Sequence, residues 1–389
     1  MLHRSGSHVR PPAAGLLVLG LVALLPERTQ GQAGRVTIIH EEETPPFEVV
    51  LEPGPAFRSG GVDDAGWVAG VFDGVELLAD GHIALWQQLW PDQFVVASPD
   101  LPGGRVVGRR GDGPGEYRFI RWVRVFDEEF FVFDLETLRL TVLDGSGFDV
   151  ISTGTLPPGK LESDVVLLTD STFVLNATMY TPERVGYVLH AVDREGSVLS
   201  SFDEVAFGVP DAPSHLRWLV AARHGRGVWA VPWDEYRLDL WDPFAGTRLR
   251  SLIREVDWFP PHVEHSWNPE RLGSANVRSL AQDSKGHLWV LTSVPAPDRW
   301  AGCFEKATPD AHPMQGEYMV REGCFPYDAR LEVLDPEQGR VLAATVLPQG
   351  SWQAVDSGIL YTITEDTLGF PEIQLWTPRL QPKTSLPAR

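Results

Sequence analysis

The feature of this chain that most limits its fold is a repeat of short strand, tight turn and second strand, which occurs six times. Each turn contains Asp, Gly or other small polar residues, and most of the flanking runs alternate apolar and polar residues. The six turns are, in chain order, Asp80-Gly81, Asp127-Glu128-Glu129, Asp170-Ser171, His224-Gly225-Arg226-Gly227, Asp283-Ser284-Lys285-Gly286 and Asp356-Ser357-Gly358. An all-β unit repeated at such a period is typical of propellers, solenoids and similar arrays.

A second kind of turn recurs between the third and fourth strands that can be read in each repeat. It occupies residues 100–103, 144–147, 193–196, 242–246 and 335–339, and every copy starts with Asp and ends with Gly. Asp accepts local backbone hydrogen bonds and Gly supplies the positive φ that tight hairpins need. The sequence therefore predicts an all-β fold, a six-bladed β-propeller of four-stranded antiparallel blades.

The sixth repeat shows three strands only, at residues 352–355, 359–364 and 372–376. The missing strand can come from the N-terminus, where residues 36–40 and 47–51 both alternate. Such a closure joins the two ends of the chain and leaves no open sheet edge. We therefore expect one propeller domain over residues 34–380, with an insertion at 295–328 in the fifth blade and a tail at 381–389.

Residues 1–33 have the pattern of an export signal. Arg4 and Arg10 give a basic start, residues 13–25 form a short apolar run, and Gly31-Gln32-Ala33 offers small residues for cleavage. The alternative is a retained anchor, although the run is shorter than the roughly 20 apolar residues of a membrane span. We expect an exported protein, periplasmic or extracellular, with no membrane span once the signal is removed.

Charge and cysteine content restrict the partners and the compartment. The formal net charge of −20 repels phosphate backbones, so we expect no nucleic-acid partner. In an exported protein, the single pair Cys303 and Cys324 is typical of one disulfide that closes a loop. Two free thiols or half of a metal site are the alternatives, but the chain has no second cysteine pair to complete a zinc site.

One loop carries a resemblance to a known group of proteins. The stretch Gly108-Arg109-Arg110-Gly111-Asp112-Gly113-Pro114-Gly115-Glu116-Tyr117 resembles the G-R-x-G-x-G-P-G-E-[FY] loop of bacterial exported six-bladed β-propellers related to the NHL-repeat group. Residues 279–290 are also similar to an NHL repeat, and the repeat resemblance covers residues 70–376. The resemblance implies a fold, and most such relatives lack a defined activity.

In four-stranded blades, the connections between second and third strands and those between blades lie at the same end of the ring. All the long loops of this chain are of these two kinds, and long loops on a rigid scaffold commonly carry binding function. The candidate ligand-binding residues on this long-loop face are Glu116, Tyr117, Tyr180, Arg184, His215, Trp233, Tyr236, Trp267 and Trp300. The alternative is structural: Glu116 and Tyr117 fix a glycine-rich crossover between blades, and the aromatic residues pack inside.

His262, Glu264 and His265 form a dense group of potential metal ligands. Two imidazoles and a carboxylate suit Zn²⁺ or a similar ion, and some six-bladed propellers hold Ca²⁺ or Zn²⁺ at the channel mouth. Solvated loop histidines are the alternative, because the spacing is not that of the HExxH metalloproteases.

Two functions follow from these observations. The first is a non-catalytic interaction propeller that holds a peptide, glycan or protein partner on its long-loop face. The second is a metal-dependent hydrolase or lyase, lactonase-like or peptidyl-lyase-like, in which His215 joins the metal group. We favour binding, because the sequence contains no Gly-x-Ser-x-Gly elbow and no defensible Ser/His/Asp arrangement, and we assign no catalytic residue and no required cofactor.

Overall fold

The computed structural model describes most of the chain from residue 34 onward. The described residues are 34–40, 44–58, 72–87, 91–99, 103–205, 216–221, 227–260, 269–306, 318–321, 323–355, 358–365 and 371–383. Within them the secondary structure consists of β-strands and one 3₁₀ turn, η1 (Ala301–Cys303). The predicted export signal at residues 1–33 lies outside the described residues. None of the described helical segments has the length and apolar character that a membrane crossing needs.

The first three blades are four-stranded sheets whose strands follow one another in chain order, innermost strand first. Blade 1 contains β3 (Phe72–Leu77), β4 (Ile83–Gln87), β5 (Phe94–Ala97) and β6 (Arg105–Val107). Blade 2 contains β7 (Ile120–Phe126), β8 (Glu129–Asp134), β9 (Arg139–Asp144) and β10 (Val150–Thr155). Blade 3 contains β11 (Gly159–Thr169), β12 (Thr172–Met179), β13 (Tyr187–Asp193) and β14 (Val198–Glu204).

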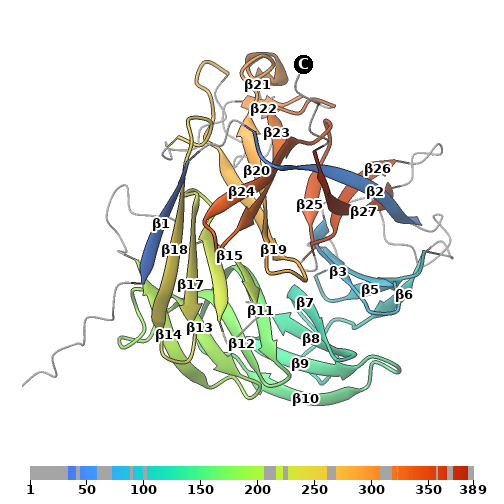
Figure 1. Ribbon diagram of the computed structural model, residues 1–389. Coiled ribbons are helices and arrows are strands. Elements are labelled where there is room, and N and C mark those ends of the chain that lie inside the picture. The colour runs from blue at the N-terminus through green and yellow to red at the C-terminus, as the bar shows by residue number, and fades with distance from the viewer. Residues whose placement is uncertain are drawn as a thin grey trace, which may run out of the picture. The chain divides into compact units, whose positions relative to one another are not determined.

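The other three blades complete the ring (Figure 1). Blade 4 contains β15 (Arg217–Ala221), β16 (Val228–Pro232), β17 (Arg237–Asp242) and β18 (Thr247–Glu255). Blade 5 contains β19 (Asn276–Gln282), β20 (Leu288–Pro295), β23 (Tyr327–Asp335) and β24 (Arg340–Val346). Blade 6 contains β25 (Trp352–Ala354), β26 (Leu360–Glu365), β27 (Pro371–Pro382) and β2 (Phe47–Arg58). The predicted six-bladed β-propeller is therefore confirmed.

The recurring Asp/Gly turns have the conformations that their residue types predict. In the turn after β13, Oδ1 of Asp193 accepts hydrogen bonds from the backbone N–H groups of Glu195 (3.1 Å) and Ser197 (2.7 Å). Gly196 follows at a φ of 94°, and a Cβ there would lie 1.7 Å from the carbonyl oxygen of Thr155. Only glycine therefore fits both the left-handed conformation and the close approach of the neighbouring blade.

The N-terminal segment serves two blades, and only part of this was predicted. β2 pairs antiparallel with β27 and so supplies the missing strand of blade 6, as expected for residues 47–51. β1 (Arg35–His40) instead lies parallel to β18 as a fifth strand of blade 4. Figure 1 shows these two blue strands on different blades, and both lie close to β24 of the blade between them. The segment thus connects the outer edges of three consecutive blades.

β27 is longer than the sequence pattern suggested, since it continues past Trp376 to Pro382. Up to Trp376 it pairs with β26 on one side and β2 on the other, whereas beyond this residue it pairs with β2 alone. Pro378 and Pro382 therefore sit where one edge of the strand is free, and a proline without an N–H group is tolerated there.

The insertion in blade 5 forms a small unit with its own packing. It connects β20 to β23 and contains η1, β21 (Phe304–Lys306) and β22 (Tyr318–Val320), which pair antiparallel. A disulfide joins Cys303 to Cys324, as predicted. The buried Trp300, Cys303 and Phe304 form a satellite core under this hairpin.

Large apolar side chains hold neighbouring blades together. Phe94 of blade 1 stacks on Phe130 of blade 2 with ring centroids 5.7 Å apart. Phe133 of blade 2 meets Phe173 of blade 3 edge to face at 5.3 Å. Aromatic pairs of this geometry contribute beyond the area that they bury. The inner strands are thereby fixed relative to one another, and this positions the residues of the central channel.

His190 makes the stability of the fold sensitive to acid. Its ring is fully buried on β13, 2.8 Å from Oγ of Ser201 and 3.1 Å from the carbonyl oxygen of Ala177. Burial removes water from the charged form and lowers the pKa of His190 from 6.5 to about 4. Below pH 6.5 the unfolded chain therefore binds a proton that the folded protein does not, and stability is lost as the pH falls toward 4.

We expect His190 to contribute a slope of about 1.4 kcal/mol per pH unit within this window. Urea unfolding of the parent protein and of His190→Gln at pH 7, 6 and 5 measures this contribution. The stability advantage of the parent over the variant should shrink at each step toward pH 5. Parallel pH profiles for the two proteins would contradict the prediction.

Candidate functional site

All six innermost strands contribute residues to one hollow in the central channel. The hollow has a volume of about 360 Å³. Its lining includes Gly74, Arg121, Glu162, Trp218, Arg278 and Gln353, one from each blade in turn. Each of these residues stands second to fourth in its strand, close to the point where the chain enters the blade. The hollow therefore lies toward the end of the ring that the crossovers between blades enter.

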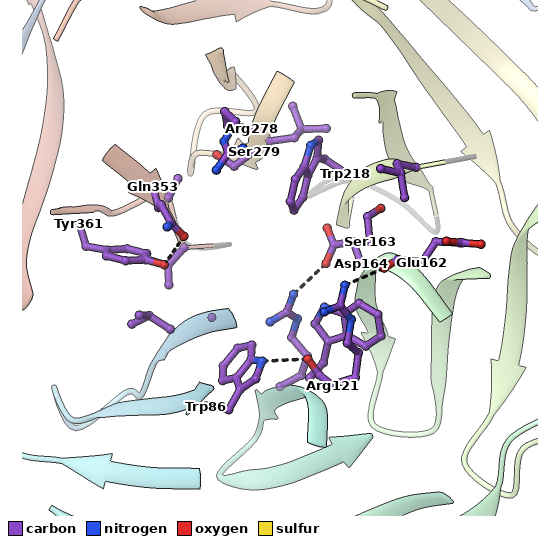
Figure 2. A pocket seen from close by; sticks show the side chains of 18 residues that line it. Trp86, Arg121, Glu162, Ser163, Asp164, Trp218, Arg278, Ser279, Gln353 and Tyr361 are labelled. Atoms are coloured by element: carbon purple, nitrogen blue, oxygen red, sulfur yellow. Dashed lines mark hydrogen bonds and ion pairs between the residues drawn. The ribbon is translucent and has the colours of Figure 1, made fainter. Parts of the chain in front are cut away.

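Two indole rings form fixed walls of this hollow (Figure 2). Nε1 of Trp86 donates a hydrogen bond of 2.8 Å to the carbonyl oxygen of Arg121, on the next blade. Nε1 of Trp218 likewise donates to the carbonyl oxygen of Val277, on the blade that follows its own, at 2.7 Å. Each ring is thus held across a blade boundary, and its orientation is set before any ligand binds.

The carboxylates of the channel are already engaged. Asp164 accepts a hydrogen bond from Nη2 of Arg124 at 2.8 Å and another from the backbone N–H of Leu219. Glu162 accepts from Nζ of Lys160 at 2.8 Å and from the hydroxyl of Thr178 at 2.9 Å. Because each negative charge has a cation and a further donor, neither is available as an open cation site.

Two other arginines in the channel have no carboxylate partner among the described residues. Nη2 of Arg121 donates to the carbonyl oxygen of Glu162 at 3.0 Å, and its guanidinium lies 4.8 Å from the centre of the Trp122 ring. Its buried Nε has no hydrogen-bond partner among the residues that the structure describes. Arg278 has no hydrogen bond or ion pair from its side chain to any part of the chain that the structure describes.

Further polar groups face the same space from two neighbouring blades. The buried hydroxyl of Ser279 has no hydrogen-bond partner within the described residues. Gln353 accepts a 2.6 Å hydrogen bond from the Tyr361 hydroxyl at Oε1, which leaves its amide NH₂ as a donor. Figure 2 shows Arg278, Ser279 and Trp218 along one side of the hollow and Gln353 beside Tyr361. The arrangement offers several donors and flat apolar walls.

The loop of residues 108–118 is the crossover between blades 1 and 2, and backbone hydrogen bonds between Arg109, Gly111 and Tyr117 close it on itself. The Glu116 carboxylate accepts hydrogen bonds from the backbone N–H of Gly113 (2.9 Å) and from Nε of Arg109 (3.0 Å), and these contacts lower its pKa. Tyr117 is fully buried, and burial raises the pKa of its hydroxyl. Neither side chain lines the channel hollow. Their contacts fit the alternative in which Glu116 and Tyr117 fix the glycine-rich crossover between blades.

The other described candidates from the long-loop face have different surroundings. Tyr236 and Trp300 are buried, Trp233 is half-buried, and none of the three lines the channel hollow. The hydroxyl of Tyr236 donates to Glu332, and desolvation raises its pKa well above the usual value. The burial of Tyr117, Tyr236 and Trp300 fits the structural alternative of packing residues, and contact of any of them with a ligand stays a prediction.

Tyr180 and Arg184 lie in the loop between β12 and β13. The Tyr180 side chain is 66% exposed, and Arg184 pairs with its neighbour Glu183 at 3.1 Å. Both are accessible on the long-loop face, so a role for them in binding a large partner stays a prediction.

The remaining candidates, His215, His262, Glu264, His265 and Trp267, lie outside the described residues. The metal-dependent alternative therefore stays a prediction. In the described part of the chain, no group of three or more His, Cys, Asp or Glu side chains is arranged to hold a metal ion.

The sequence analysis missed the channel residues because it looked for binding residues in the long loops and not in the innermost strands. The available signal was the presence of cations in otherwise apolar innermost strands. β7 reads Ile-Arg-Trp-Val-Arg-Val-Phe and β19 reads Asn-Val-Arg-Ser-Leu-Ala-Gln. An arginine in the first strand of a propeller blade must face either the channel or a buried partner. This criterion selects Arg121, Arg124, Arg217 and Arg278, and all of these except Arg217 line the hollow.

A second hollow, of about 470 Å³, lies between blades 1 and 2 near the tight-turn end. Its lining includes Asp80, His82, Arg105 and Phe148. The Arg105 guanidinium lies 4.4 Å from the centre of the Phe148 ring and donates to the carbonyl oxygen of Gly147 at 2.7 Å. In this second hollow the Arg105 cation is engaged, and residues of only two blades form the lining. We therefore take the channel hollow, which all six blades line, as the candidate site.

Comparison with known proteins gives likeness in fold alone. No family model matches the sequence, and no curated protein matches it. A DUF4221 family member from Bacteroides vulgatus superposes with a TM-score of 0.57 at 12% identity, over 86% of this chain and 99% of that one. A Bacteroides fragilis protein assigned as exported gives 0.57 at 11% identity, over 89% and 99%. These neighbours support the propeller fold.

Proposed function

We propose that this protein is an exported binding propeller that holds a small ligand, or the end of a glycan or peptide, in the crossover end of its central channel. The observation that carries the proposal is the hollow to which all six blades contribute. Its volume is within the range of roughly 300–1,000 Å³ that is typical of small-molecule sites. A few polar groups between fixed aromatic walls are also typical of such sites.

Further observations support the exported part of the proposal. The predicted signal at residues 1–33, the disulfide between Cys303 and Cys324, and the exported assignment of the Bacteroides fragilis neighbour are all consistent with an oxidising compartment. We also propose that the loop at residues 108–117 relates this protein to the exported propellers of the NHL-repeat group, which its sequence resembles.

The proposal can be tested by filling the channel hollow with a large side chain and measuring whether ligand binding is lost. Ser279→Phe places a ring in the hollow without changing its charge, and Ser171→Phe makes the same substitution in an exposed turn at the opposite end. Thermal denaturation is followed with a panel of sugars, sugar acids, amino acids, dipeptides and aromatic acids. We expect at least one class to raise the melting temperature of the parent and of Ser171→Phe but not of Ser279→Phe.

Two results would contradict this proposal. One is the absence of stabilisation by any class of the panel in the parent protein. The other is equal stabilisation in Ser279→Phe, which would place the binding site away from the channel.

A further inference from the structure

Arg278 is unusual among the buried and channel arginines of this protein. The others have carboxylate or carbonyl partners: Arg217 pairs with Asp203 at 2.7 Å, and Arg124 pairs with Asp164 at 2.8 Å. The Arg278 side chain has no such partner among the described residues, although it projects into the channel hollow from β19 (Figure 2). The Arg278 side chain is exposed to solvent, so its guanidinium faces the open space of the channel, although the protein around it lowers its pKa.

The lack of a partner does not reflect a shortage of carboxylates. The chain has 53 Asp and Glu residues against 33 Lys and Arg, so negative groups are available in excess. Within the hollow the balance is nevertheless reversed, because three arginines line it against Glu162 and Asp164, which are both engaged. Arg121 and Arg278 are therefore like charges in one hollow without a carboxylate partner among the described residues, and an anionic ligand relieves their mutual repulsion.

The neighbours of Arg278 indicate what kind of anion fits. Ser279 adds a hydroxyl for which the described part of the chain provides no partner. A guanidinium and a hydroxyl together match the oxygens of a carboxylate, sulfate or phosphate. The Trp218 indole, whose orientation is fixed by its bond to the next blade, stands beside them in the hollow. An indole face suits a flat or ring-shaped apolar surface.

We propose that the channel site selects a ring-bearing oxyanion, with Arg278 and Ser279 binding the anionic group and Trp218 contacting the ring. This inference rests on the proposed function, since it names the ligand class of the same site. Sugar acids and aromatic carboxylates are two sources of this chemistry. A simple inorganic oxyanion binds more weakly, because it leaves the indole wall uncovered.

Matched acidic and neutral ligands test the inference. Binding of glucuronate and glucose, of benzoate and benzyl alcohol, and of sulfate is measured by calorimetry at constant ionic strength in chloride buffer. We expect at least one acid to bind the parent about tenfold or more tightly than its neutral counterpart, which is the range of a hydrogen bond to a charged group. Whichever of glucuronate and benzoate binds more tightly shows whether the ligand is a sugar acid or an aromatic carboxylate.

Three variants assign this preference to Arg278. Arg278→Met should abolish the preference for the acid and, without ligand, should melt at the temperature of the parent or higher. Arg278→Lys keeps the charge and should retain part of the preference. Arg340→Met removes an exposed arginine on the outer strand of the same blade and should behave as the parent.

The inference is overturned if no acidic ligand binds, if acidic and neutral ligands bind equally, or if Arg278→Met keeps the preference. These results are distinguishable from failure of the proposed function. If a neutral ligand binds the parent and is lost in Ser279→Phe, the channel is still a binding site and only the selection of anions is wrong.

Discussion

A chain that begins after Arg58, and so lacks both β1 and β2, is expected not to reach a cooperatively folded state. β2 is the outer strand of blade 6 and pairs with β27 along most of its length. Its Phe57 is 0% exposed, within the apolar cluster between blades 6 and 1. At its other end, Phe47, Val49 and Leu51 pack against the cluster between blades 5 and 6.

The expected loss exceeds what a domain of this kind can tolerate. Removal of one buried Phe side chain costs about 3–5 kcal/mol, whereas the total stability of a domain is about 5–15 kcal/mol. The deletion also leaves β27 as an open sheet edge, which favours aggregation. Circular dichroism melting and size-exclusion chromatography should show loss of the cooperative transition and of the monomer peak.

A shorter deletion provides the control. A chain that begins at Thr44 lacks β1 only and loses the parallel pairing with β18, so it should fold with a melting temperature a few degrees lower. A synthetic peptide of residues 44–58, added to the longer deletion during refolding, should restore a cooperative transition. Parent-like melting of the chain that begins after Arg58 would show that closure by β2 is dispensable.

The number of blades could be predicted because turn chemistry is local. Asp and Gly at fixed positions determine each hairpin, and residues such as Asp193 and Gly196 make in the structure the contacts that their types predict. The destination of the N-terminal strands could not be predicted in the same way. Residues 36–40 and 47–51 have the same alternation, and only the tertiary contacts place one on blade 4 and the other on blade 6.

The candidate site was harder to predict than the fold. For aromatic residues on long loops, such as Tyr236, the sequence left ligand contact and packing open, and Tyr236 packs inside among other aromatic rings. The channel residues Arg121 and Arg278 come from different blades and are far apart in the chain. Their meeting follows from the closure of the ring, which no local pattern encodes.

Replacement of Glu332 is expected to give the largest loss of stability of any single polar substitution that we consider. Glu332 on β23 is 0% exposed and accepts hydrogen bonds from Arg254 on β18 at 3.1 and 3.2 Å. Arg254 is itself buried, with a side chain 1% exposed, and it also donates to the carbonyl oxygen of Ile39. The pair therefore joins blade 4, blade 5 and β1 in a region without solvent.

We expect Glu332→Met to lower the free energy of unfolding by about 3–5 kcal/mol, because it leaves the buried Arg254 guanidinium without a counter-charge. Arg254→Met should cost less, since Glu332 keeps Arg330 at 3.2 Å and the Tyr236 hydroxyl at 2.9 Å. The double variant with Met at both positions should recover part of the loss, because two apolar side chains replace the buried pair, whereas the buried Tyr236 hydroxyl still lacks Glu332 as its acceptor. Urea denaturation of the four proteins at pH 7 gives these differences. A double variant that is less stable than Glu332→Met would show that shape, rather than the unpaired charge, determines the loss.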